Sequence, residues 1–171
     1  IVIYSNHGAG VIEGVTRSPV SLEGARSTFV IRNEGQHWLE RNDGHEMADV
    51  IDRNVVKSAD GQGRAVTFGN APEPSEDSML LREREAFEAI EAGKSAATGI
   101  LYDSLEAPPD APMTPEGIPQ VIEGVRGDSH WLDIPRITAT ILDPKRSPQV
   151  SRRYWFNQIV AAEDAWCDPK H

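Results

Sequence analysis

Hydrophobic and polar positions in the N-terminal part of the chain alternate between short apolar runs and longer stretches with helical spacing. Compact, β-branched runs predict strands at residues 28–31, 65–68 and 99–102. Their unbroken apolar character is typical of strands that are covered on both faces, as in a parallel sheet. Two more strands are predicted at 1–4 and 10–16, and the turn-rich residues between them indicate a hairpin.

Apolar residues with helical spacing predict the helices. Met47, Val50, Ile51 and Val55 would share one side of a helix over residues 44–58. A capping serine or an early proline marks the start of other helices. These further helices are predicted at residues 75–92, with Ser75 as the N-cap, and at 116–124, 134–142 and 147–163.

The order of these elements predicts the fold class. Strands that alternate with helices predict an α/β layer structure over residues 1–107. The proline-rich residues 108–112 cannot form regular structure. We therefore expect a boundary at this loop, followed by a helical subdomain or linker over residues 108–171.

Composition excludes several classes of protein. The chain has 171 residues and is 39% apolar, which suffices for a domain with a hydrophobic core. No apolar run approaches the roughly 18–20 residues of a membrane span, and the N-terminus shows no signal-peptide pattern. The net charge of −10 argues against a surface that wraps DNA. The single cysteine, Cys167, excludes an internal disulfide and a cysteine-rich zinc site.

A basic segment near the C-terminus is a local exception to the acidic charge. It contains Lys145, Arg146, Arg152 and Arg153. These side chains either contact phosphate groups or form a solvated helix face, and the second arrangement is the more common one.

The predicted strand at 28–31 ends abruptly in the polar residues Arg32, Asn33 and Glu34. Ligands of α/β proteins bind outside the carboxyl ends of strands, where an acid can polarise water or hold a metal near a phosphate. Glu34 is therefore a candidate catalytic residue. The alternative is a loop carboxylate that caps the next element, because many strands end in an acid.

The strand at 65–68 also ends in residues that suit a ligand, Gly69 and Asn70. One helix separates the two strands, so they form a βαβ unit, and a right-handed crossover would place both strand ends at one edge of the sheet. We expect Glu34 and Asn70 to face one crevice at this edge. Taken alone, the Gly-Asn pair is also typical of a simple turn.

Two other motifs resemble known sites but lack the required context. The glycines between residues 8 and 14 imitate a dinucleotide-binding turn, but a β-branched alternation follows where that motif needs a helix, which favours a hairpin. His45 and Glu46 resemble the start of a zinc-protease motif. That motif requires a second histidine where this chain has Asp49, which excludes it.

An ordered set of segments resembles the terminase large subunits of actinobacteriophages. Residues 28–38, Thr-Phe-Val-Ile-Arg-Asn-Glu-Gly-Gln-His-Trp, are similar to the Walker B region of that family. The strand and Ser-Pro loop ahead of it (10–26) and the helix behind it (44–54) are similar to their counterparts. Residues 68–71, Phe-Gly-Asn-Ala, resemble the coupling motif, and residues 151–166 resemble the segment that leaves the ATPase domain. No single motif is specific, whereas the ordered set covers nearly the whole chain.

The resemblance implies a partial P-loop-type ATPase sheet of mainly parallel strands with flanking helices, and ATP and Mg²⁺ as cofactors. Glu34 would orient the water that attacks the γ-phosphate. Asn33 stands where many ATPases place an acid that helps to hold Mg²⁺, and its amide would contact the metal only through a bound water. Asn70 would belong to the coupling motif. Arg26 would be a phosphate-side charge or an ordinary surface arginine.

The implied function is ATP hydrolysis that drives viral DNA into procapsids. Residues 1–107 would be the Walker B half of the ATPase domain, and residues 108–171 would lead towards a nuclease domain. The implied partners are duplex viral DNA, the portal protein, the small terminase subunit and further copies of the protein in a ring, with no membrane. The implied location is the host cell cytoplasm and, transiently, the portal vertex of the procapsid.

The chain contains no Gly-x-x-x-x-Gly-Lys-[Ser/Thr] phosphate-binding loop. Because it also lacks an initiator methionine, we expect a fragment that hydrolyses ATP poorly by itself, with the loop upstream and the nuclease downstream. The main alternative is a non-catalytic, ATPase-like assembly or interaction module. A third is an unrelated nucleotide-binding enzyme with the same strand-end geometry.

Overall fold

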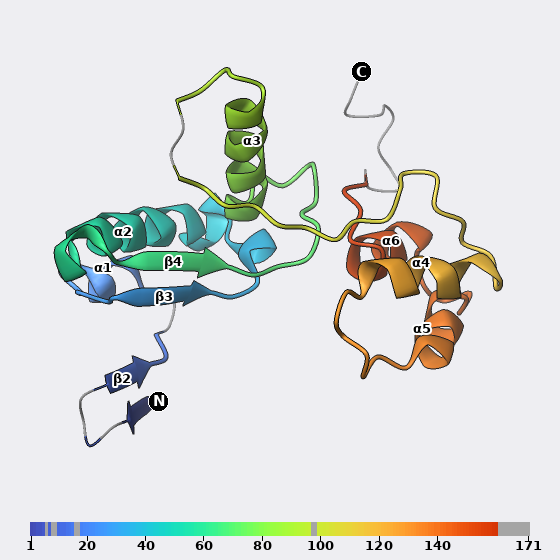
Figure 1. The fold of residues 1–171 in the computed structure, drawn as a ribbon, viewed down its shortest axis with the longest axis horizontal. Helices are drawn as coiled ribbons and strands as arrows, with labels where there is room; N and C mark the ends of the chain where they lie inside the picture. Colours follow the sequence, from blue (N-terminus) through green and yellow to red (C-terminus); the bar gives the residue numbers. More distant parts are fainter. Residues whose placement is uncertain (6, 8–9, 16–17, 97–98, 161–171) are drawn as a thin grey trace.

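The protein forms a mixed α/β structure with two small sheets and several helices (Figure 1). The computed structural model describes residues 1–5, 7, 10–15, 18–96 and 99–160. The predicted α/β class is confirmed at this level. Besides the elements described below, short helical segments occur at α1 (Pro19–Leu22), η2 (Gly35–His37), η3 (Glu40–Asn42) and η4 (Ala59–Gly61).

The N-terminal residues form the predicted hairpin. β1 (Val2–Ser5) and β2 (Gly10–Glu13) pair in antiparallel fashion and make a sheet of their own. A strand therefore occupies the position at which a dinucleotide-binding motif would need a helix. β2 ends before residue 16, the predicted end, and residue 16 itself lies outside the described residues.

The second sheet contains the βαβ unit that the sequence predicts. β3 (Phe29–Arg32) and β4 (Arg64–Thr67) are parallel, and α2 (Gly44–Lys57) lies between them in the chain and covers one face (Figure 1). Arg32 pairs with Thr67 at the last position of the register. Both strands therefore end at the same edge of the sheet.

Within the described part of the chain, this sheet is covered on one face and open on the other. Val30 and Ala65 pack against the hydrophobic cluster of α2. Phe29 and Ile31 point to the opposite side and are 59% and 61% exposed. The prediction that strand 28–31 is covered on both faces is wrong for the described residues, because they place helices against one face. The buried cluster consists of Leu22, Met47, Val50, Ile51 and Val55.

α3 (Met79–Glu91) begins later than predicted. Its N-cap is Ser78, whose hydroxyl oxygen accepts a hydrogen bond from the Leu81 N–H at 3.2 Å. The N–H of the first helical residue donates to the Trp38 carbonyl at 2.9 Å, which fixes the start of the helix there. The predicted N-cap, Ser75, instead belongs to the preceding loop.

The strand predicted at 99–102 is wrong, because residues 99–107 have no regular structure. Tyr102 stacks on Phe87 of α3 with 5.3 Å between the ring centroids, and Leu101 is exposed. Of this apolar run, the Tyr102 ring therefore packs against α3. Among the described residues, no strand pairs with it through ladder hydrogen bonds.

The C-terminal part contains the three predicted helices, α4 (Gly117–Val125), α5 (Ile134–Ile141) and α6 (Pro148–Trp155). α6 ends well before residue 163, because Asn157 adopts a positive φ of 51° that turns the chain away. Residues 161–163 lie outside the described residues. None of the described helices is long and apolar enough to cross a membrane. The hydrophobic core of this part comprises Ala107, Ala111, Ile118, Ile122, Ile137, Ile141 and Phe156.

Candidate functional site

Glu34 stands at the carboxyl end of β3, where the chain changes direction. Its backbone is left-handed, with φ 56° and ψ 51°, a conformation that costs a non-glycine residue about 1–3 kcal/mol. This turn starts η2 and directs the Gly35 N–H to the Phe68 carbonyl at 2.9 Å. The carboxylate of Glu34 remains exposed at the edge of the sheet.

Gln36 joins the two strand ends through its side-chain amide. Its Nε2 donates to Glu34 Oε2 at 2.6 Å, and its Oε1 accepts from the Asn70 N–H at 3.2 Å. The side chain is buried, with 2% of the residue exposed. The structure thus brings Glu34 and Asn70 to one edge, as the βαβ pattern indicates, and it does so through a residue that the sequence did not single out.

Two glycines allow the close packing at this edge. A Cβ atom on Gly69 would lie 2.3 Å from Gln36 Oε1, and one on Gly35 would lie 2.5 Å from Thr67 Cγ2. Real Cβ atoms do not approach other atoms so closely. The glycine after β4, which the sequence marks as a site of close approach, is therefore required by the packing of Gln36.

The other two predicted site residues lie differently. Asn33 is exposed beside Glu34, and its backbone carbonyl accepts a hydrogen bond from Trp38 Nε1 at 3.0 Å. Arg26 precedes β3 and so lies towards its amino end, whereas Glu34 and Asn70 follow the carboxyl ends of the strands. The structure therefore does not bring Arg26 to this edge.

An ion-pair cluster around a buried arginine lies directly behind the edge, and the sequence pattern did not indicate it. Arg32, the last residue of β3, donates to Asp52 of α2 at 3.0 Å and to Glu83 of α3 at 2.7 Å. Its Nε also donates to Thr67 Oγ1 of β4 at 3.1 Å. One guanidinium therefore connects both strands to both helices, close to Glu34 in the chain.

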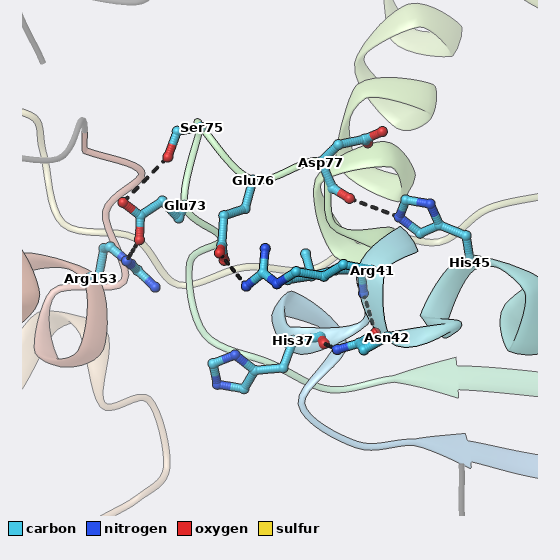
Figure 2. Close-up of polar contacts among 10 residues, drawn as sticks. His37, Arg41, Asn42, His45, Glu73, Ser75, Glu76, Asp77 and Arg153 are labelled. Carbon is cyan, nitrogen blue, oxygen red and sulfur yellow. Dashed lines mark hydrogen bonds and ion pairs between the residues drawn. The ribbon is translucent and has the colours of Figure 1, made fainter. Parts of the chain in front are cut away.

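The loop after β4 is held on one side by the segment that follows β3 (Figure 2). Arg41 of η3 pairs with Glu76 at 2.6 Å, and His45 Nε2 lies 2.8 Å from the Asp77 carbonyl oxygen. The His45 imidazole therefore contacts a backbone carbonyl of this loop. A hydrogen bond from Arg82 holds the pKa of the Asp77 carboxyl below its ordinary value of 3.8.

On its other side the same loop contacts the C-terminal helical part. Glu73 forms an ion pair with Arg153 of α6 (Figure 2). Arg152 donates to Gln158 Oε1 at 2.8 Å and to the Ala111 carbonyl at 3.1 Å. Two arginines of the basic segment are therefore engaged inside the fold, which disfavours one continuous phosphate-binding patch.

The edge offers few groups to a metal ion. In the part of the chain that the structure describes, no group of three or more histidine, cysteine, aspartate or glutamate residues is arranged to hold a metal. The described groups at the edge are the Glu34 carboxylate and the amides of Asn33 and Asn70. These groups could contact a water or an ion that a phosphate also holds. They are too few to complete the octahedral ligand set of Mg²⁺, so any Mg²⁺ would take its remaining ligands from elsewhere.

Comparisons with known proteins relate the chain to phage gene products. It is similar to the Gene 13 proteins of Mycobacterium phages D29 and L5, with 40% identity to each over 189 residues. The match covers 99% of this chain and 31% of each relative, so the chain spans about a third of their length. No protein-family model and no solved structure matches the chain. A bacteriophage origin is supported, and the names of the relatives state no activity.

Proposed function

We propose that the chain is the Walker B half of the ATPase domain in a phage terminase large subunit, the motor that packages viral DNA. The observation that carries the proposal is the meeting of Glu34 and Asn70 at the carboxyl edge of a parallel strand pair. An acid and a polar residue on neighbouring strand ends are what water activation and γ-phosphate sensing need. The mycobacteriophage relatives agree with a viral role.

The open face of the sheet supports a place in a larger P-loop-type sheet. Parallel strands are normally covered on both faces, but Phe29, Ile31 and Phe68 are all more than half exposed in the described structure. The relatives are about three times as long as the matched region. On this proposal, the helices that cover this face, further strands at the edges of the sheet and the phosphate-binding loop belong to the remainder of the complete viral protein.

The proposed chemistry assigns Glu34 to the attacking water. Its exposed carboxylate would accept a hydrogen bond from that water and orient it for in-line attack on the γ-phosphate of ATP. Mg²⁺, when bound with ATP, would neutralise the developing phosphate charge. Movement of the Asn70 strand end would transmit the change to DNA through the loop that follows it.

Substitution of Glu34 in the complete viral protein tests the proposal. We expect Glu34→Gln to keep ATP binding and to reduce turnover by at least about 100-fold, because the amide cannot accept a proton from the attacking water. Glu91→Gln, the same change at the exposed end of α3, is the matched control. Wild-type turnover by Glu34→Gln would remove Glu34 from the mechanism.

A second candidate is a non-catalytic, ATPase-like module for assembly or interaction. Asn33 favours it, since an amide stands where the resemblance leads one to expect an acid. On this alternative the complete protein would bind its partners without hydrolysing ATP. Steady ATP hydrolysis by the wild-type protein, lost in Glu34→Gln, would exclude it.

A further inference from the structure

Glu34 is itself the left-handed residue of the turn and its carboxylate is exposed, so the orientation of this carboxylate depends on a contact with another group. Gln36 is the residue in position to do this. Its Nε2 holds Glu34 Oε2 at 2.6 Å, which leaves the second carboxylate oxygen to accept from a water. The amide itself is buried between the strand ends.

The same amide also contacts the residues that follow β4. Gln36 Oε1 accepts from the Asn70 N–H at 3.2 Å, and the Gly69 backbone packs directly against it. If the end of β4 shifts, the oxygen loses its donor and the planar amide turns. Because donor and acceptor belong to one rigid plane, this rotation also moves the NH₂ group that holds Glu34.

We infer that Gln36 is a positioning residue that couples the Asn70 end of β4 to the orientation of the Glu34 carboxylate. This inference rests on the proposed function, because it requires Glu34 to act on the attacking water. An amide is needed here since it donates on one side and accepts on the other. A carboxylate at position 36 would keep the acceptor for Asn70 but would repel Glu34, and an apolar side chain would serve neither partner.

The test uses the complete viral protein with the variants Gln36→Met and Gln36→Glu, both close to glutamine in size. We expect kcat for ATP hydrolysis to fall by about 10–100-fold, because misplacement of a catalytic group by about 1 Å has effects of this order. KM for ATP is expected to stay within about twofold, since Gln36 contacts the catalytic group and not the nucleotide. Gln62→Glu, at an exposed turn, is the matched control.

A second site separates positioning from a loss of folding. Gly69→Ala leaves Gln36 unchanged but places a Cβ where the amide oxygen lies, so it should displace the bridge and lower kcat in the same way. Circular dichroism identifies the variants that remain folded. If both Gln36 variants unfold, the kcat of Gly69→Ala decides, and wild-type kcat in that variant overturns the inference.

The outcomes distinguish this inference from the function on which it rests. Loss of turnover in Glu34→Gln together with wild-type kcat in the folded Gln36 variants would overturn the positioning role alone. A raised KM with unchanged kcat would also overturn it, because Gln36 would then act in binding. Full turnover in Glu34→Gln would overturn the proposed function and this inference with it.

Discussion

Replacement of Arg32 by methionine should destabilise the fold far more than replacement of a surface arginine. The Arg32 side chain is 7% exposed, and its partners Glu83 and Asp52 are 27% and 58% exposed. Removal of the guanidinium leaves the partly buried Glu83 with only the Thr67 hydroxyl, at 3.3 Å, as a donor among the described residues, and Thr67 loses the donor at its own oxygen. Asp52 can rehydrate, because more than half of its side chain already faces water.

The individual contacts give the magnitude. The guanidinium is charged, so its bonds to Glu83 and to Thr67 are both charge-assisted and contribute about 1.5–3 kcal/mol each, with the longer bond to Thr67 at the lower end. The exposed pair with Asp52 contributes at most about 1 kcal/mol. Methionine recovers part of this by apolar packing. We therefore expect Arg32→Met to lower the free energy of unfolding by about 2–4 kcal/mol.

Urea unfolding of the 171-residue chain measures this effect. Circular dichroism reports the loss of the helices. Arg53→Met is the control, since Arg53 also lies on this helix–sheet unit but forms an exposed pair with Glu23 at 3.4 Å. We expect Arg53→Met to lower the free energy of unfolding by less than about 1 kcal/mol. Equal losses in the two variants would refute the assignment of Arg32 as the link between strands and helices.

Two further predictions concern the loop after β4. A double-mutant cycle with Glu73→Gln and Arg153→Met should give a coupling on the order of 1 kcal/mol in urea unfolding, because the pair is partly buried, and strictly additive effects would contradict a real ion pair. Asp77→Asn should remove a pH-dependent stabilisation. The pKa of Asp77 is lowered in the fold, so its contribution is present above pH 4 or so and is lost as the pH falls through the lowered value. Unfolding at pH 7 should therefore separate this variant from the wild type, and the difference should shrink as the pH falls below about 4.

Elements with strong local patterns could be predicted from the sequence. The helix over residues 44–58 was found because Met47, Val50, Ile51 and Val55 all face the same core. The parallel pair was found because one helix separates two short apolar runs. The prediction of a strand at 99–102 was wrong because a strand also needs a neighbouring strand that forms ladder hydrogen bonds with it. An apolar run alone does not supply that neighbour.

The contacts of the candidate site could be predicted only in part. Glu34 and Asn70 could be identified because each follows a predicted parallel strand, and the topology brings the carboxyl ends of such strands to the same edge of the sheet. Gln36 could not be found in this way, because its position depends on the left-handed turn at Glu34, and a glutamate rarely adopts that conformation. Arg26 is close to β3 in sequence but precedes the strand and is exposed, which fits the ordinary surface arginine that the sequence also allowed.

The position of Arg32 explains why the turn at Glu34 can be maintained. A left-handed glutamate persists only if the residues on both sides are fixed. On one side Arg32 ties the end of β3 to α2 and α3, and on the other the Gly35 N–H and the Gln36 amide tie the chain to the end of β4. The two sets of contacts act on opposite ends of the same short turn. A loss of the Arg32 cluster should therefore loosen Glu34 even though Arg32 does not touch it, which makes the carboxylate orientation dependent on the packing of the helices behind the sheet.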